Sequence, residues 1–194
     1  MNHKEVNGSS AEEAPMTKLD FIISEISLDD VEAIENMRFQ SWLDTYPNEE
    51  FGFTAEMIKE RFADKLSPEG LERKRQEYAK NLNDPNFLQL AVKDDFGKIV
   101  GALVAVKDDK EGYEVDMIYT DKSVHGTGVG GTLMDRAMDW FGDDEDVLVE
   151  VASYNERAKA FYRKYGFAEV GEPRILNVPN MPLQKMIRRG AGGR

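Results

Sequence analysis

Residues 113–131 read YEVDMIYTDKSVHGTGVGG, which combines an alternating strand pattern, a polar turn and four closely spaced glycines. The sequence that follows, TLMDRAMDWFG, has apolar residues every three to four positions, as in an amphipathic helix. The first backbone N–H groups of such a helix lack intrahelical acceptors and lie at the positive end of the helix dipole, so they bind anions. Glycine side chains leave the approach to these groups open. We therefore predict that a phosphate-bearing ligand binds at residues 126–131.

The composition excludes several classes of protein. The 194 residues include no cysteine, so disulfides and thiolate chemistry are excluded, and with only His3 and His125 no metal site is predicted. The net charge of −12 argues against nucleic acid and anionic membranes as partners and favours cationic ones. No apolar run reaches the roughly 18 residues that span a bilayer, and residues 1–17 lack the apolar core of a signal peptide. We expect a cytoplasmic protein.

Periodicity and capping residues predict one domain at residues 19–189, between flexible tails at residues 1–18 and 190–194. Helices are predicted over residues 27–43, 54–66, 67–82, 129–141 and 155–165. Strands are predicted over residues 20–26, 87–93, 99–107, 113–120, 146–152, 167–170 and 183–188, with 171–182 as a loop. The three consecutive strands at 87–120 are expected to be antiparallel, because only short turns join them.

The glycine spacing alone fits two kinds of phosphate loop. Gly126, Gly128 and Gly131 match the dinucleotide fingerprint GxGxxG, whereas the first two with Gly130 match GxGxG. Glu150 even follows at about the distance at which the fingerprint needs an acid. However, a polar segment separates the strand from the first glycine, Glu150 stands inside a strand, and too few strands remain for a doubly wound sheet. A Walker loop is excluded because no Gly-Lys-Ser/Thr follows.

A second motif decides between the two. NERAKAFYRKYGF at 155–167, together with HGTGVG at 125–130, resembles the GNAT family of N-acetyltransferases. Its members carry a Gln/Arg-Gly-x-Gly-x-Gly/Ala loop for the acetyl-coenzyme A pyrophosphate, then a helix patterned Asn-x-x-Ala-x-x-x-Tyr that ends in Gly-Phe. EVDMIYT at 114–120 is similar to the family's Glu-Leu-x-x-Leu-Tyr-Val strand. The matching residues are Asn155, Ala158, Tyr162, Gly166, Phe167, Glu114, Ile118 and Tyr119.

The resemblance implies an α/β (α+β) fold with a mixed, mostly antiparallel central sheet of six to seven strands, flanked by helices, one of them the glycine-led cofactor helix. It also implies acetyl-coenzyme A as co-substrate. Two residues depart from the family pattern, because His125 stands where glutamine or arginine is usual and Thr120 where valine is usual. The implied cofactor-binding residues are Ile118, Tyr119, Thr120, His125, Gly126, Thr127, Gly128, Val129, Gly130, Asn155, Ala158 and Tyr162.

Acetyl transfer to an amine requires a proton acceptor and, for the departing thiolate, a proton donor. The resemblance marks Glu114 as the base, while Asp116, two residues on, and a water chain are alternatives; Glu114 also fits an ordinary strand carboxylate. Tyr162 is the candidate acid, although a tyrosine on that helical face also fits core packing. Asn155 fits both a helix cap and a partner of the pantetheine arm. A solvent-facing loop position is favoured for His125.

The family builds its acceptor pocket from the first helices and their connecting loop. Here that region holds aromatic side chains, including Trp42 and Tyr46, among carboxylates, a combination that suits a cation with an aliphatic body. Residues 41–58 look similar to the polyamine-acetylating branch, so Trp42, Tyr46 and Glu114 are the predicted substrate-binding residues. Other readings are a protein amine or an antibiotic as acceptor, or a non-catalytic acyl-coenzyme A-binding module. The expected partners are a small-molecule amine and a second copy of the chain.

Overall fold

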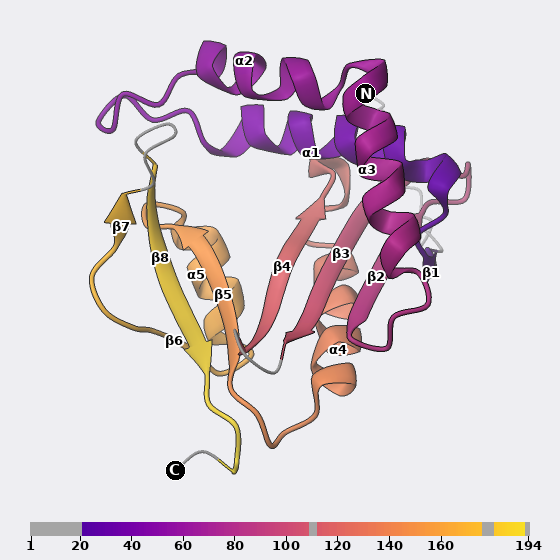
Figure 1. Cartoon of the computed structure of the whole chain (residues 1–194). Coiled ribbons are helices and arrows are strands. Elements are labelled where there is room, and N and C mark those ends of the chain that lie inside the picture. The colour runs from indigo at the N-terminus through magenta and orange to yellow at the C-terminus, as the bar shows by residue number, and fades with distance from the viewer. Residues whose placement is uncertain (1–20, 109–111, 176–180, 193–194) are drawn as a thin grey trace, which may run out of the picture.

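One mixed sheet forms the centre of the computed structural model, which describes residues 21–108, 112–175 and 181–192 (Figure 1). Its strand order is β1-β2-β3-β4-β5-β8-β6, with β7 beside β8, and every pair is antiparallel except β4–β5. The strands are β1 (Ile22–Glu25), β2 (Phe87–Lys93), β3 (Ile99–Asp108), β4 (Gly112–Thr120), β5 (Val147–Ala152), β6 (Phe167–Glu169), β7 (Arg174–Ile175) and β8 (Pro182–Arg188).

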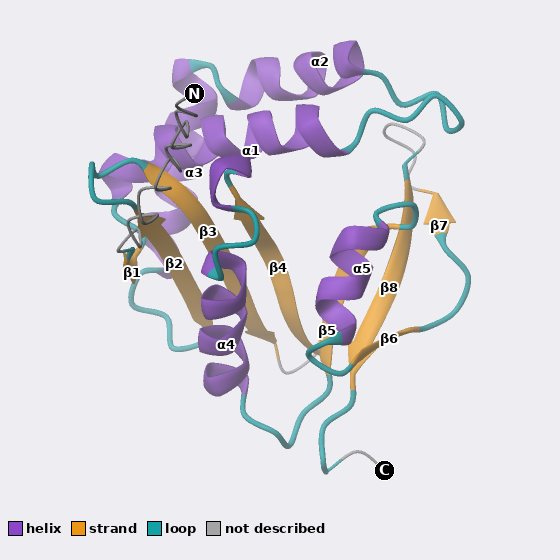
Figure 2. Ribbon diagram, turned by 180° about the vertical axis from the view of Figure 1, so that it is seen from behind, coloured by secondary structure: helices purple, strands orange, loops and turns teal. Residues whose placement is uncertain are grey.

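Helices cover both faces and one end of the sheet. α4 (Val129–Phe141) and α5 (Glu156–Arg163) lie on one face (Figure 2), α3 (Pro68–Asn81) lies on the other, and α1 (Val31–Thr45) and α2 (Ala55–Lys65) cross one end. Apolar side chains at every third or fourth position of α4 are buried, as predicted, because this face of the helix packs on β2, β3 and β4. No helix among the described residues has the length and apolar character needed to cross a membrane.

Side-chain caps begin the helices as predicted from the sequence. Thr54 Oγ1 accepts from the N–H of Met57 at 3.3 Å, and Ser67 Oγ accepts from the N–H of Gly70 at 3.0 Å. The helix predicted to start at Ser27 instead opens with a 3-10 turn, η1 (Leu28–Asp30), and becomes α-helical at Val31. α1 and α2 lie over the end of the sheet where β3 begins and β4 ends (Figure 1).

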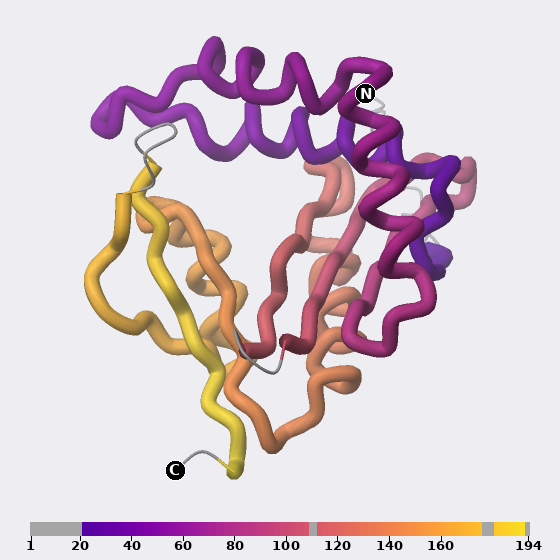
Figure 3. Tube along the Cα trace, viewed as in Figure 1, coloured from indigo at the N-terminus to yellow at the C-terminus, as the bar shows by residue number. Residues whose placement is uncertain are grey.

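The sheet divides between β4 and β5. These parallel strands pair only at Tyr113 with Val147 and at Glu114 with Leu148, and beyond those pairs they diverge (Figure 3). A bulge at Asp116 also shifts the register of β4 against β3. As a result Val115 and Ile118, three residues apart, both pack toward α4. The edge of β4 that faces β5 therefore has no strand partner among the described residues over 115–120.

The closing strands differ from the prediction in number. The predicted loop at 171–182 contains β7, whose Arg174 and Ile175 pair with Leu183 and Pro182 of β8, so eight strands are described rather than six to seven. A two-residue strand is too short to show any alternation, which is why the sequence pattern missed it. The last predicted helix, at 155–165, is shorter at both ends, because α5 begins at Glu156 after the capping residue Asn155 and ends at Arg163, before Gly166 with its φ of 82°.

The predicted tails are only partly visible. The tail at residues 1–18 lies outside the described residues, and so do residues 193 and 194. Gly190 and Ala191, which the sequence places in the second tail, donate backbone N–H groups to Asp146 Oδ1 at 2.9 Å and to the carbonyl of Asp143 at 2.6 Å. These contacts hold the chain after β8 against the segment that leads into β5.

Candidate active site

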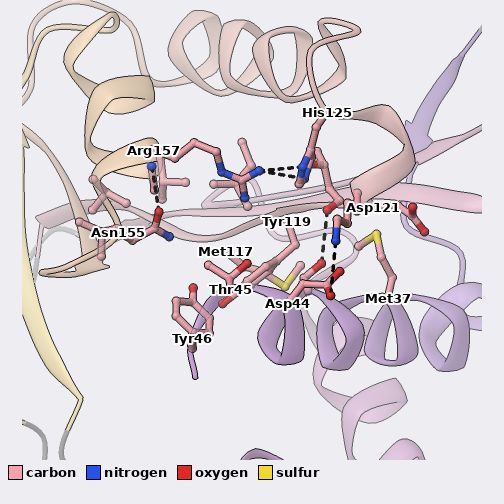
Figure 4. Close-up of a pocket in the computed structure, with 18 of the residues that line it drawn as sticks. Met37, Asp44, Thr45, Tyr46, Met117, Tyr119, Asp121, His125, Asn155 and Arg157 are labelled. Atoms are coloured by element: carbon pink, nitrogen blue, oxygen red, sulfur yellow. Dashed lines mark hydrogen bonds and ion pairs between the residues drawn. The ribbon is translucent and has the colours of Figure 1, made fainter. Parts of the chain in front are cut away.

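Two cavities lie where β4 and β5 separate. The smaller, of about 210 Å³, is lined by α1, the diverging parts of β4 and β5, and the start of α5 (Figure 4). The larger, of about 840 Å³, is lined by the glycine loop before α4 and by one face of α5. The cavities are adjacent, and seven residues line both of them: Ile118, Tyr119, Thr120, His125, Arg157, Ala158 and Tyr162. Six of these seven residues were predicted from the sequence to bind the cofactor.

The glycine loop has a backbone conformation that suits the anion site predicted from the sequence. Gly126 and Gly128 have φ of 80° and 98°, which side-chain-bearing residues rarely adopt. An added Cβ at either would meet no atom within 4 Å, so backbone conformation rather than space requires glycine there. Gly128 gives no side-chain cap to α4, which leaves the first N–H groups of the helix free of a protein side chain. Gly128, Gly130 and Gly131 all line the larger cavity.

Two predicted loop residues lie outside both cavities. Thr127 Oγ1 donates to the carbonyl of Val124 at 2.8 Å. The side chain of Val129 is only 3% exposed and belongs to the core beneath α4. Because neither side chain lines a cavity, a contact of these two residues with a ligand would have to come from the backbone.

Tyr162 stands at the junction of the two cavities. Its side chain packs against Phe161 and Phe167 with ring centroids 5.5 and 5.9 Å apart, and its hydroxyl has no hydrogen-bond partner among the described residues. Burial, with a smaller contribution from Tyr119, raises the pKa of Tyr162 well above that of a free tyrosine. The hydroxyl therefore keeps its proton at neutral pH and is available as a donor in the cavity.

Asn155 caps α5, as its sequence position predicted. Its Oδ1 accepts from the N–H of Ala158 at 3.1 Å, which orients the side chain at the edge of the smaller cavity (Figure 4). Since Oδ1 is used by the helix, the amide nitrogen is the part of Asn155 left to donate to a ligand. Ala158 lines both cavities and presents no bulk there.

Three carboxylates gather where β4 and β5 part. Burial, then the charges of Asp116 and Glu150, raise the pKa of Glu114. Glu114 itself lines neither cavity, whereas Asp116 and Glu150 line the smaller one. Glu150 is paired with Arg174 at 2.7 Å, and exposed Asp116 has no ion-pair partner among the described residues. Asp116, at the bulge, therefore lies at the wall of the smaller cavity, whereas Glu114, two residues earlier on β4, does not.

The predicted acceptor aromatics take different positions. Tyr46 lines the smaller cavity, and burial, followed by the effect of Tyr119, raises its pKa well above the ordinary value. Trp42 is 8% exposed and lines neither cavity; its Nε1 donates to Tyr119 Oη at 2.9 Å, and its ring lies edge-on to Tyr46 at 4.8 Å. Trp42 therefore contacts Tyr119 and Tyr46, which both line the smaller cavity, and helps to fix their side chains. Tyr154 Oη donates to the carbonyl of Tyr46 at 2.8 Å across the opening.

His125 has a partner that the sequence did not reveal. Arg157, from the first turn of α5, approaches His125 Nδ1 with Nη1 at 2.7 Å (Figure 4). Burial and the charge of Arg157 lower the pKa of His125, despite opposing effects of the Thr120 carbonyl and Asp121. His125 is exposed, as predicted, but its ring is fixed by this contact.

Several other residues that line the cavities were not predicted from the sequence. Arg157, Phe161 and Lys164 line the larger cavity, and their spacing of three to four shows that they share one face of α5. That spacing was readable in the sequence, but it marks a polar face as readily as a binding face. Asp44, at the end of α1, lines the smaller cavity and reaches it only through the packing of α1 over the sheet.

The acetyltransferase (GNAT) family model matches residues 39–167, which is more than half of the chain. The chain belongs to this family. The GNAT match confirms the predicted activity class, an acetyl-coenzyme A-dependent N-acetyltransferase, and the similar solved structures confirm the fold.

Among those structures is a PaiA N-acetyltransferase from Thermoplasma acidophilum in complex with coenzyme A. It is 17% identical, covers 86% of this chain and 98% of its own, and has a TM-score of 0.65. A GNAT acetyltransferase from Streptococcus pneumoniae is 19% identical over 87% of this chain and 98% of its own, with a TM-score of 0.64. A variant of spermidine N-acetyltransferase SpeG from Vibrio cholerae is 18% identical over 86% and 92%, with a TM-score of 0.59. No curated protein sequence matches significantly.

Proposed function

We propose that this GNAT protein transfers the acetyl group of acetyl-coenzyme A to a primary amine by direct attack, and that the amine is a polyamine. The observation that carries the proposal is the meeting of the two cavities at Tyr162. One cavity is bordered by the anion site of the glycine loop, and the other by carboxylates. An anionic co-substrate and a cationic acceptor therefore reach the same tyrosine from opposite sides.

The residues of the larger cavity fit acetyl-coenzyme A. The free N–H groups at the start of α4 suit the pyrophosphate, and Arg157 and Lys164 on α5 add positive charge to the same cavity. The unpaired edge of β4 at Ile118 and Thr120 suits the amides of the pantetheine arm, which can pair with it like an added strand. The amide nitrogen of Asn155 is a further donor for that arm.

The carboxylates supply a base for the amine. A primary ammonium group has a pKa of about 10.4, so it must lose a proton before its nitrogen can attack at neutral pH. Asp116 is an exposed carboxylate of the smaller cavity on β4, whereas Glu114 lines neither cavity and would act on the amine through water. The raised pKa of Glu114 makes it a stronger base than an ordinary carboxylate. Glu114 and Asp116 thus act on the proton that the attacking nitrogen releases.

Tyr162 then serves the leaving group. Attack of the amine nitrogen on the acetyl carbonyl carbon forms the C–N bond, and breaking of the C–S bond releases the thiolate. The Tyr162 hydroxyl, which has no other partner among the described residues, donates to that sulfur. The chain has no cysteine to form an acyl-thioester enzyme, which agrees with direct attack rather than a covalent intermediate.

The charge of the smaller cavity favours a polyamine. Asp44, Asp116 and Glu150 place carboxylates along its wall, Tyr46 at the end of α1 also lines it, and the whole chain carries a net charge of −12. The SpeG structures similar to this fold are of spermidine N-acetyltransferases, one of them dodecameric. A second copy of this chain as partner and a cytoplasmic location remain our predictions.

Comparison of acceptors tests this proposal. With saturating acetyl-coenzyme A, kcat/KM is measured for spermidine, an aminoglycoside, free amino acids and peptide amines. We expect spermidine to be preferred, and Asp116→Asn to raise its KM by about tenfold, the effect of losing one charge-assisted contact. Asp139→Asn is the matched control, because Asp139 is exposed near the C-terminal end of α4 and lines neither cavity. A higher kcat/KM for a peptide or antibiotic would refute the polyamine assignment. Cofactor binding without turnover of any amine would indicate a non-catalytic module.

A further inference from the structure

His125 and Arg157 make a contact that requires a neutral histidine. Arg157 Nη1 lies 2.7 Å from His125 Nδ1, and a guanidinium group can only donate hydrogen bonds. Nδ1 must therefore be an acceptor, with the ring proton on Nε2. Both residues line both cavities, so the contact stands at the passage between the glycine loop and α5 (Figure 4).

The described carboxylates near His125 are paired with groups other than Arg157. Asp121 is held by Lys98 at 2.8 Å and by Ser123. Lys122, next along the chain, lies 3.9 Å from Asp44. Arg157 has no carboxylate partner among the described residues; its hydrogen bond there goes to Nδ1 of His125, while the protonated Nε2 lies farther away, at 3.4 Å. A guanidinium that borders an anion site and has only a neutral ring as partner is ready to bind an incoming anion.

We propose that His125 and Arg157 form a proton-coupled clamp for the cofactor pyrophosphate, in which the bound anion draws Arg157 away from Nδ1 and the imidazole takes up one proton. Both side chains then face the pyrophosphate as cations. This inference rests on the proposed cofactor site. It explains why a histidine can stand at the first position of the loop, where the family usually has glutamine or arginine.

Binding of the pyrophosphate and protonation of His125 should favour each other. In the free protein, burial and Arg157 lower the pKa of His125 below its ordinary value of 6.5. The two negative charges of a bound pyrophosphate favour the protonated ring and raise that pKa. Because the complex then holds more protons than its components, affinity increases as pH falls between the bound and the free pKa. The increase is limited to tenfold per pH unit, since at most one proton is taken up.

Nuclear magnetic resonance can follow His125 directly. The chain has only two histidines, so His3→Gln leaves the ring of His125 as the only imidazole signal. Dephospho-coenzyme A is the ligand of choice, because its pyrophosphate does not titrate near neutral pH, unlike the 3′-phosphate of coenzyme A. We expect the His125 pKa to rise on binding, and the affinity of His3→Gln to fall several-fold from pH 6 to pH 8. Calorimetry in two buffers of different ionisation enthalpy should report proton uptake.

Two variants separate the clamp from a structural role. His125→Gln restores a usual family residue at an exposed position; it should bind the ligand with no proton uptake and with an affinity that does not change with pH. Arg157→Gln should shift the pH range of uptake upward, because the charge that opposes protonation of His125 is gone. Binding with an unchanged His125 pKa would overturn the clamp and leave the proposed function intact. Absence of binding to dephospho-coenzyme A and acetyl-coenzyme A alike would overturn the proposed function itself.

Discussion

Substitution of Tyr162 by phenylalanine separates a catalytic hydroxyl from a packing residue. The ring packs against Phe161 and Phe167, and phenylalanine preserves those contacts. The hydroxyl has no hydrogen-bond partner among the described residues, so its removal leaves no protein group unsatisfied. We expect Tyr162→Phe to change the free energy of unfolding by no more than about 0.5 kcal/mol.

The expected effect on turnover is large by comparison. Donation by a positioned acid contributes about 10²–10⁴-fold to a rate. A tyrosine has a higher pKa than a thiol, and burial increases this difference for Tyr162, so complete proton transfer to the thiolate is uphill unless the sulfur is equally desolvated. The effect should therefore lie near the lower limit, about a hundredfold in kcat or about 2.7 kcal/mol of barrier. The affinity for acetyl-coenzyme A should stay within about twofold.

Thiol release at saturating co-substrate gives kcat, urea denaturation gives the free energy of unfolding, and calorimetry gives the affinity. Phe161→Leu is a useful comparison, because it alters the packing beside Tyr162 while keeping the hydroxyl. A kcat of Tyr162→Phe within about twofold of the wild type would refute the role of the hydroxyl. A loss of several kcal/mol of stability would show instead that Tyr162 is needed mainly for the core.

Two further substitutions test the loop and the base. Gly128→Ala should destabilise the protein by about 1–3 kcal/mol, because φ of 98° is strained for alanine, and should lower its melting temperature by roughly 2–4 °C per kcal/mol; Gly131→Ala, at a helical position with Tyr165 Oη 3.5 Å away, should be tolerated. Glu114→Gln should lower kcat/KM yet stabilise the fold at pH 7. Folding raises the pKa of Glu114 above its ordinary 4.5. Ionised Glu114 therefore lowers the free energy of unfolding at pH values above the pKa of the folded state, and it has no such effect at pH values below the pKa of the unfolded state. Urea denaturation at pH 7 and pH 4 should show that Glu114→Gln gains less free energy of unfolding at pH 4. An equal gain at the two pH values would contradict a raised pKa of Glu114.

Local patterns predicted most of the fold. Capping residues such as Thr54 and Ser67 act within one helical turn, and the alternation of β2, β3 and β4 reflects burial on two faces, so both were readable from the chain. The bulge at Asp116 was not readable, because it depends on how β3 and β4 twist against each other. The two-residue β7 was missed for the same reason, since only its partner β8 defines it.

In the candidate site too, features that depend on local sequence were predictable, and features that depend on tertiary packing were not. The glycines and Asn155 act through backbone conformation and capping, which are local, and the structure places them where the sequence predicts. Which carboxylate reaches the cavity depends on the separation of β4 from β5, and this favours Asp116 over Glu114 for direct exposure. Arg157 could be recognised only once α5 was packed beside His125.

Initial velocities with acetyl-coenzyme A and spermidine varied together test the central claim most directly. We expect thiol release that depends on the amine, one acetylated amine for each thiol, and double-reciprocal lines that intersect, because both substrates must occupy the two adjacent cavities before the C–N bond forms. Parallel lines would contradict direct attack. Thiol release that does not respond to any primary amine would contradict the transfer itself.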